Sequence, residues 1–203
     1  MVTRHILALA GLLSQSAKSC FHSTPQPKKI TPFEIAYQFV RSIEGEHSNH
    51  PYDYGGQTYA GISRKAWPHW SGWKYIDEGK KVPEELVEEF YRKRFWDALQ
   101  CDKLPPAVAF VLFDSAVGSG HVIPVKWLQG IIGAKQDGIV GPETIRKSWE
   151  IPAGTIVAKM ISNRLALYKA IEIRDSRQKV FRYGWLWRTM KLNYAVRKNF
   201  LRA

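Results

Sequence analysis

Hydrophobic residues recur at helical spacing over most of the chain. The first apolar face predicts a helix from Pro32 to about Ile43 that ends at Gly45. Thr31 and Glu34 form a capping box at its start, because each side chain can accept a hydrogen bond from the other residue's backbone amide. The apolar face of this helix consists of Phe33, Ala36, Val40 and Ile43. The folded part of the chain is therefore expected to begin with an amphipathic helix.

Helical periodicity returns in the second part of the chain. A helix is expected from Pro83 onward, with core candidates at Leu86, Phe90, Phe95 and Leu99. Two apolar helices are expected in 105–120 and 124–133, separated at Gly118 to His121. The remaining expected elements are a turn with a short helix in 137–150, a long amphipathic helix over 153–173 and a final aromatic, basic helix in 181–198.

The pattern is different just after the first helix. From Glu46 to Gly61 no periodicity survives, and glycine and proline punctuate the segment, which predicts turns or a short hairpin. No stretch has the strict alternation of polar and apolar residues that a large sheet requires. The expected fold class is therefore mainly α (α+β), with a small β-hairpin element after the first helix.

Residues 1–29 have a pattern of their own. A basic pair precedes an apolar run from Ile6 to Leu13, and no acidic residue occurs before Glu34. This arrangement is typical of a short export signal or signal anchor, whereas an organellar transit peptide fits less well. The run is shorter than the roughly 18 apolar residues expected of a membrane-spanning helix. We expect the folded domain to begin near Ile30, after a polar linker.

Composition narrows the classes of partner. The net charge of +12 and the isoelectric point near 9.7 should attract polyanions such as nucleic acid, anionic lipid or the phosphate-bearing bacterial envelope. Nucleic acid is disfavoured, because the basic residues are scattered and no nucleic-acid-binding motif occurs. Eight tryptophans are compatible with a groove that covers the apolar faces of sugar rings. Cys20 and Cys101 are too few for a disulfide framework and lack metal-site spacing, so one tail thiol and one half-buried thiol are expected.

Glu44 and Asp53 lie where the first helical pattern stops. Glu44 follows Val40 by four positions, at the carboxyl end of an apolar helix face. Desolvation against that face and the negative end of the helix dipole both raise the pKa of a carboxyl group. Asp53 falls among turns, where contact with water keeps a carboxyl pKa low. Glycoside cleavage uses such a protonated acid with a charged partner, although two ordinary loop charges are the simpler alternative.

The spacing of these residues favours the active-site interpretation. Phage-type lysozymes carry a Glu at a helix end, eight intervening residues, an Asp, a short gap and a Thr. This chain has Glu44, Asp53 and Thr58, with a final gap that is one residue shorter. The segment more closely resembles glycoside hydrolase family 108, a group of phage endolysins and bacterial muramidases whose signature reads roughly EGGYVNDPxDPGGxTxYGIT. The gapless matches are Glu44, Gly45, Asn49, Pro51, Asp53, Gly55, Gly56, Thr58, Gly61 and Ile62.

Four positions depart from that signature. The departures are Glu46 for the second Gly, His50 for the usual acid, Tyr54 for Pro, and Ala60 where an aromatic residue is usual. His50 and Ala60 are expected to flank the cleft, where they would change substrate contacts. Glu46 is a second candidate for the acid, but Glu44 carries the family's Glu-Gly step and continues the helix face.

The resemblance extends to about residue 190. The segment from Trp127 to Thr144 is similar to the predicted peptidoglycan-binding segment that follows the catalytic region in the family. Without the resemblance, a turn and a core position would explain this segment equally well. Asp114 fits a structural hydrogen-bonding residue better than a catalyst. Three parts are expected: a leader and linker (1–29), a catalytic muramidase region (30–105), and a helical peptidoglycan-binding-like region (106–203) packed on it, with the cleft between the two lobes.

The resemblance implies a lysozyme-like fold and hydrolysis of the β-1,4 bond between N-acetylmuramic acid and N-acetylglucosamine. Glu44 would protonate the leaving oxygen. Asp53 would stabilise positive charge on the sugar, or would position a water molecule together with Thr58. The implied substrate contacts are Asn49, Gly55, Gly56, Tyr59, Trp127 and Gln129. The resemblance implies no metal and no organic cofactor.

The expected partner is the glycan strand of peptidoglycan, bound by a monomer that is exported across the bacterial inner membrane or anchored in it. Transient membrane association through the N-terminus is expected, and a nucleic-acid partner is not. Two other classes remain: a non-catalytic wall-binding protein, and a cationic membrane-active protein that uses the basic aromatic helix near Trp185 to Arg197. The presence of Glu44, Asp53 and Thr58 argues against the first.

Overall fold

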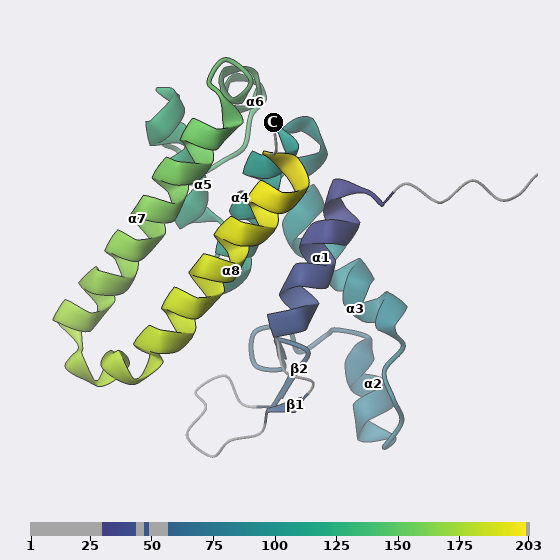
Figure 1. Cartoon of the computed structure of the whole chain (residues 1–203). Helices are drawn as coiled ribbons and strands as arrows, with labels where there is room; N and C mark the ends of the chain where they lie inside the picture. Colours follow the sequence, from purple (N-terminus) through teal and green to yellow (C-terminus); the bar gives the residue numbers. More distant parts are fainter. Residues whose placement is uncertain (1–29, 44–46, 49–56, 202–203) are drawn as a thin grey trace, which may run out of the picture.

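The computed structural model describes residues 30–43, 47–48 and 57–201. The leader 1–29 and its expected signal or anchor lie outside these residues. The described part is mainly helical, with one small sheet, as the sequence predicts (Figure 1). Its helices are α1 (Pro32–Ile43), α2 (Gly72–Asp77), α3 (Glu84–Tyr91), α4 (Pro106–Ser119), α5 (Val122–Ile132), α6 (Pro142–Ser148), α7 (Ala153–Arg174) and α8 (Arg182–Phe200). No helix in this part of the chain is both long enough and apolar enough to cross a bilayer.

The first helix begins and ends where its sequence pattern predicts. The backbone N–H of Thr31 donates to Glu34 Oε2 at 2.7 Å, and the backbone N–H of Glu34 donates to Thr31 Oγ1 at 3.2 Å. This reciprocal pair is the expected capping box, which satisfies two amides that the first turn of a helix leaves without partners. The apolar face of α1 is buried through Phe33, Ala36, Tyr37 and Val40.

Helix α4 is the centre of the molecule. Nearly all its residues from Ala107 to Ala116 are apolar, and all ten are buried. A helix that is apolar on every side is stable only when neighbours surround it. Helices α1, α5, α7 and α8 pack around α4, together with the short helical turns η1 (Arg92–Asp97) and η2 (Cys101–Lys103) (Figure 1). The core therefore runs through both halves of the chain.

The helix expected after Pro83 changes its winding at residue 92. Helix α3 continues directly into η1, a π-helical turn with more residues per turn than an α-helix. The wider turn shifts the buried face. Phe90 and Leu99 are buried as predicted, but Leu86 and Phe95 are only partly buried, and the other buried positions are Val87, Tyr91 and Trp96.

The turn-rich segment contains a three-stranded antiparallel sheet in the order β1 (His47–Ser48), β2 (Thr58–Tyr59) and β3 (Ile62–Ser63). Thr58 is paired with Ser48 on one side and with Ser63 on the other. Strands β2 and β3 form a tight hairpin through Ala60 and Gly61, whose φ angles are +50° and +78°. Positive φ at both central residues matches the twist of the strands, and Ala60 carries the steric cost that glycine avoids.

The four expected helices of the second half are all present, as α5 to α8. Helices α7 and α8 lie side by side and are joined by the 3-10 helix η3 (Ser176–Phe181), which the sequence pattern did not predict; it also did not predict α2 (Figure 1). One cysteine prediction was wrong. Cys101 is fully buried rather than half-buried, because it faces α4 with its thiol against the carbonyl of Ala109.

Candidate functional site

The structure describes the approach to the predicted catalytic segment. Helix α1 ends at Ile43, which is the residue directly before Glu44. Glu44 and Asp53 lie outside the described residues, as do the expected substrate contacts Asn49, Gly55 and Gly56. Their predicted roles therefore remain predictions. The described surroundings are the last turn of α1, the hairpin β2–β3 and the segments packed on them.

An ion pair fixes the last turn of α1 to the start of α3. Arg41 donates to both carboxylate oxygens of Glu84, from Nε at 2.8 Å and from Nη2 at 3.1 Å, and the hydroxyl of Tyr37 donates to the same carboxylate. The hydrogen bond from Arg41 lowers the pKa of Glu84, while burial and the hydrogen bond to Glu84 raise the pKa of Tyr37. The carboxylate and the phenol therefore keep their charge states through neutral pH. The ion pair therefore fixes the last turn of α1 at Arg41, three residues before Glu44.

Two predicted site residues lie next to each other on β2. Thr58 and Tyr59 are half-buried, and successive side chains of a strand point to opposite faces of the sheet. The ring of Tyr59 stacks on that of Trp70, with centroids 6.1 Å apart. Ala60, which was expected to flank the cleft, is instead completely buried, and its carbonyl accepts a hydrogen bond from the hydroxyl of Tyr91 at 2.8 Å. The tight turn directs its side chain into the core.

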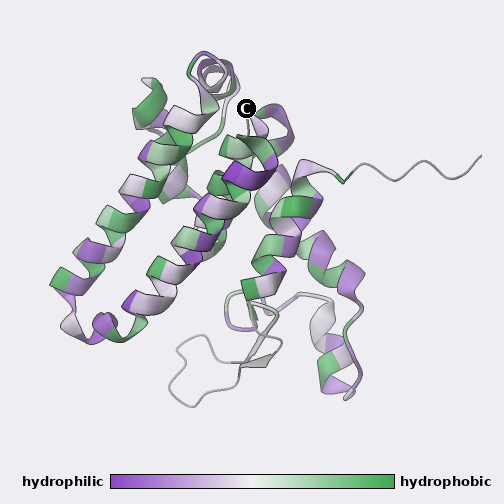
Figure 2. Cartoon of the chain, in the orientation of Figure 1, coloured by the Kyte–Doolittle hydropathy of each residue, from purple (hydrophilic) through white to green (hydrophobic). Residues whose placement is uncertain are grey.

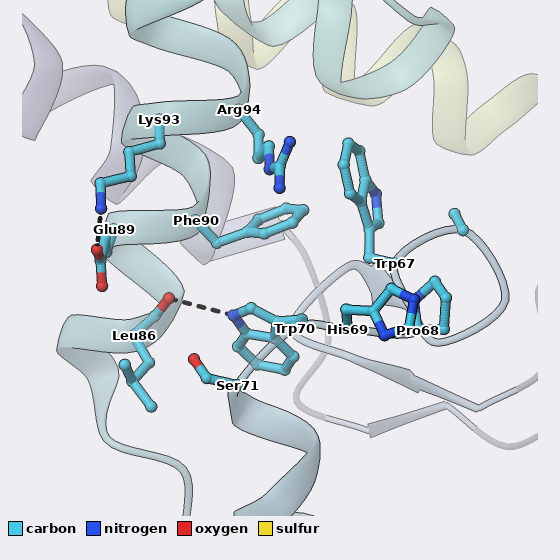
Figure 3. A pocket seen from close by; sticks show the side chains of 11 residues that line it. Trp67, Pro68, His69, Trp70, Ser71, Leu86, Glu89, Phe90, Lys93 and Arg94 are labelled. Atoms are coloured by element: carbon cyan, nitrogen blue, oxygen red, sulfur yellow. Dashed lines mark hydrogen bonds and ion pairs between the residues drawn. The ribbon is translucent and has the colours of Figure 1, made fainter.

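A pocket of about 340 Å³ lies between the loop 66–71 and the helical surface of α3 and η1 (Figure 3). Its aromatic walls are the rings of Trp67, Trp70 and Phe90. The ring of Phe90 meets Trp67 edge to face at 5.1 Å and Trp70 at 6.1 Å. Because Trp70 also contacts Tyr59, this aromatic pocket adjoins the strand that carries Thr58. The sequence analysis missed it, although the pair of tryptophans three residues apart in Trp67–Trp70 was a visible signal.

Cationic and polar groups surround the aromatic walls. The guanidinium of Arg94 lies over the ring of Trp67, 4.9 Å from its centroid, and Lys93 forms an ion pair with Glu89 at the rim (Figure 3). The indole N–H of Trp70 donates to the carbonyl of Leu86 at 3.4 Å, which helps hold its ring in place. Apolar ring faces beside charged hydrogen-bonding groups suit a ligand with both apolar faces and polar substituents, and sugars have this character.

Trp127 lies in a different part of the molecule. It is half-buried and lines a smaller pocket of about 110 Å³ between the end of α4 and helices α5, α7 and α8. Tyr168 and Trp185 line the same pocket, and their rings stack with centroids 4.9 Å apart. Sequence reasoning missed that these two residues share a pocket with Trp127, since they lie more than forty positions away along the chain.

A buried ion cluster adjoins this second pocket through Arg164. Asp114 is fully buried and accepts hydrogen bonds from Arg164 Nη1 at 2.5 Å and from Arg188 Nη2 at 2.8 Å. Burial alone would raise the pKa of Asp114, but the charges of the two arginines outweigh burial and lower it. The carboxylate is therefore ionised at neutral pH. Asp114 has the structural role expected of it, because it joins α4 to both α7 and α8.

Gln129 is in the interior rather than at a surface. Only 1% of it is exposed, and its amide group donates to Asp137 Oδ1, Ile139 O and Thr144 Oγ1 at 2.8, 3.0 and 3.2 Å. Its carbonyl oxygen accepts from the backbone N–H of Gly138 at 2.9 Å. This geometry gives Gln129 a structural role in holding the loop before α6, and it offers no support for the predicted substrate contact.

The described residues contain no group of three or more His, Cys, Asp or Glu side chains that could bind a metal ion. In the same part of the chain, every buried side-chain nitrogen and oxygen has a hydrogen-bond partner. The polar interior is thus satisfied by the protein itself.

Comparisons with known proteins agree with this arrangement. Residues 37–120 match the family described as glycosyl hydrolase 108, and residues 123–190 match the predicted peptidoglycan domain. A solved structure, that of Brucella abortus SagA, is 28% identical and similar in fold with a TM-score of 0.68, covering 84% of this chain and 96% of that one. No curated protein matches the sequence. The first match ends just after α4, so α4 lies in the first matched region, whereas the predicted boundary at residue 105 stays a prediction.

Proposed function

Residues 37–120 belong to the glycosyl hydrolase 108 family, and residues 123–190 belong to the predicted peptidoglycan domain family. On this basis we propose that the chain is a muramidase. The two family matches make the chain a glycoside hydrolase that acts on peptidoglycan, outside the cytoplasm. The bond that we propose it cleaves is the β-1,4 linkage between N-acetylmuramic acid and N-acetylglucosamine.

One observation carries the assignment of the acid. Helix α1 ends at Ile43, and its buried apolar face includes Val40, four residues before Glu44. A carboxyl group at this position feels the negative end of the helix dipole and the apolar surface of the helix, and both raise its pKa. A group that stays protonated near neutral pH can deliver a proton to the leaving glycosidic oxygen.

Asp53 and Thr58 complete the proposed mechanism. Asp53 is the charged partner, which either stabilises the positive charge that develops on the sugar or orients a water molecule with Thr58. Strand β2 supports this proposal, because it fixes Thr58 between Ser48 and Ser63. The aromatic pocket next to Tyr59 is the proposed contact surface for a neighbouring sugar of the glycan strand, through the ring faces of Trp67 and Trp70.

The decisive experiment compares two glutamates that are separated by one residue. Glu44→Gln removes the proposed acid, and Glu46→Gln makes the same chemical change two residues away. We expect Glu44→Gln to slow the release of reducing sugars from purified sacculi by about 10²- to 10⁴-fold, which is the usual contribution of a general acid. Glu46→Gln should keep wild-type activity, and both variants should unfold at the wild-type temperature.

Full activity in Glu44→Gln would refute the assignment. A loss confined to Glu46→Gln would move the acid to that residue and leave the proposed class of reaction intact. Thermal unfolding and circular dichroism of both variants separate a chemical effect from a folding defect.

A further inference from the structure

Helix α8 carries a second apolar surface, which is largely exposed. Five large apolar side chains form it, and we name them the outer stripe. Their exposed fractions are Tyr183 82%, Leu186 40%, Trp187 50%, Met190 72% and Tyr194 65%. Residues three or four positions apart lie on one side of an α-helix, so the five form a single stripe along α8.

The opposite side of α8 already supplies the core contact. Thr189, Leu192 and Val196 are buried against the rest of the molecule. The outer stripe therefore adds nothing to the core, and Figure 2 shows hydrophobic segments between hydrophilic ones along the whole length of α8. A contiguous exposed apolar surface on a folded protein commonly marks a place of contact with another molecule or with a membrane.

Further apolar side chains are exposed where α7 and α8 are joined. Ile173, Val180 and Phe181 are exposed at 76%, 74% and 54%. The ring of Phe181 lies 6.0 Å from that of Trp185, at the start of α8. Figure 1 shows this end of the α7–α8 pair projecting to one side of the molecule. A projecting apolar end can reach a flat surface without interference from the other helices.

The charge beside the stripe is mainly positive. From residue 176 to the C-terminus the sequence has no Asp or Glu, and its basic residues are Arg177, Lys179, Arg182, Arg188, Lys191, Arg197, Lys198 and Arg202. Three of them, Arg177, Arg182 and Arg188, form ion pairs with Asp175, Glu172 and Asp114. Lys191, Arg197 and Lys198 are exposed beside the stripe. The ammonium group of Lys191 lies 3.6 Å from the centroid of the Trp187 ring. An occupant of this surface must therefore be apolar within and negatively charged at its edge.

We propose that the outer stripe of α8 binds the surface of an anionic phospholipid bilayer, with the helix lying in the plane of the interface. Tryptophan and tyrosine favour the headgroup level of a bilayer, leucine and methionine can enter the acyl region, and flanking lysine and arginine attract anionic headgroups. This contact would hold the hydrolase next to the membrane, independently of the N-terminal leader.

Two other occupants fit less well. A second copy of the chain would bring two surfaces of equal positive charge together, and like charges across an interface are unfavourable. A glycan strand needs several hydrogen-bond acceptors for its hydroxyl groups, and the side chains of the stripe offer only the hydroxyls of Tyr183 and Tyr194. Its aliphatic members, Leu186 and Met190, offer a sugar nothing to stack on, whereas they suit a lipid.

The test measures co-sedimentation of the full chain with vesicles of phosphatidylglycerol and phosphatidylcholine, compared with phosphatidylcholine alone. We expect binding to the anionic vesicles only, weakening as salt rises. The double variant Trp187→Glu/Met190→Glu should raise the apparent dissociation constant by roughly tenfold or more, because two apolar anchors are lost. Ile139→Glu changes an equally exposed residue, at 69%, outside the stripe and should bind like the wild type.

A further variant separates the stripe from the leader. Leu12→Glu interrupts the N-terminal apolar run, and vesicle binding by the stripe should persist in it. The proposal is overturned if wild-type protein ignores anionic vesicles, if the double variant binds as well as Ile139→Glu, or if only Leu12→Glu loses binding. A dimer that dissociates in the double variant, or loss of sacculus binding without vesicle binding, would assign the stripe to a second copy or to glycan instead.

Discussion

The two regions matched by the family comparisons differ in where they place their polar side chains. In 37–120, ion pairs such as Arg41–Glu84, Arg64–Asp77 and Arg92–Asp102 lie at the surface, and aromatic rings fill much of the interior. In 123–190, Gln129, Thr144, Ser148, Arg164 and Thr189 are buried and hydrogen-bonded. The exceptions in the first region, Asp114 and Ser115, lie on α4 beside the second region.

This difference predicts whether a mutation should change stability or activity. Surface ion pairs contribute little to stability, whereas a buried charge or amide that loses its partner is costly. Substitutions of polar residues in the first region should therefore change activity more than stability. Substitutions of buried polar residues in the second region should change stability first.

Asp114→Asn is the strongest test of this contrast, because Asp114 is the partner of two arginines of the second region. The variant leaves Arg164 and Arg188 without their carboxylate in a buried site, so we expect the free energy of unfolding to fall by about 3–5 kcal/mol. Asp77→Asn removes an exposed ion pair with Arg64 in the first region and should change stability by less than about 1 kcal/mol. Urea denaturation measures both. Equal effects of the two substitutions would break the comparison.

Acid should remove the contribution of Asp114. Its pKa is lowered in the folded protein, so its contribution is complete above the unfolded carboxyl pKa of about 3.9 and is lost as the pH falls through the lowered value. The stability difference between wild type and Asp114→Asn should therefore be constant from pH 7 to about pH 5 and should shrink below about pH 4. Urea titrations across this range measure it. A difference that does not depend on pH would contradict the ion-cluster account.

Gln129 and Trp127 sharpen the comparison within one helix. Gln129→Ala leaves buried partners such as Thr144 unsatisfied, so we expect a loss of about 1–3 kcal/mol in stability and an unchanged affinity for sacculi. Trp127→Ala truncates a pocket wall and should act on sacculus binding more than Gln129→Ala does. Denaturation and sedimentation with sacculi, both in the Glu44→Gln background, separate the two effects. Weaker sacculus binding by Gln129→Ala at intact stability would restore its predicted role in the substrate site.

The smallest expected effect concerns the start of α1. Thr31→Ala removes one half of the capping box and should cost about 1 kcal/mol of stability, without changing the rate of sacculus hydrolysis. The matched control is Ser42→Ala, which removes an exposed hydroxyl at the other end of α1. A change in the rate of sacculus hydrolysis in Thr31→Ala would mean that the first turn of α1 influences the position of the whole helix.

The helices could be predicted because their signals are local. The capping box at Thr31 and the apolar faces of α1 and α7 need only neighbouring residues. The π-helical turn η1 could not be predicted in this way, since it depends on how Trp96 fits among Phe33 and Phe113. Nor could a periodic pattern show that one apolar side of α8 packs on the core while the other faces solvent.

In the candidate site, too, local features could be predicted from the sequence and contacts between distant elements could not. The spacing of Glu44, Asp53 and Thr58 is readable along one short segment of the chain. The aromatic pocket joins residues near 67 to residues near 90, and the Asp114 cluster joins positions 50 and 74 residues apart. Such contacts are set by packing of distant elements, which the sequence alone does not order. Gln129 shows a further difficulty, because its internal hydrogen bonds, which give it a role in the fold, depend on residues 8 to 15 positions away.

The most direct test of the central claim is mass spectrometry of the fragments that the protein releases from purified sacculi. The account predicts muropeptides whose reducing end is N-acetylmuramic acid, with one water added across the cleaved bond. Glu44→Gln should release almost none of them. Fragments ending in N-acetylglucosamine would mean that the other β-1,4 bond of the strand is cleaved, and anhydro-muramic ends would mean cleavage without water; either result would contradict the muramidase assignment.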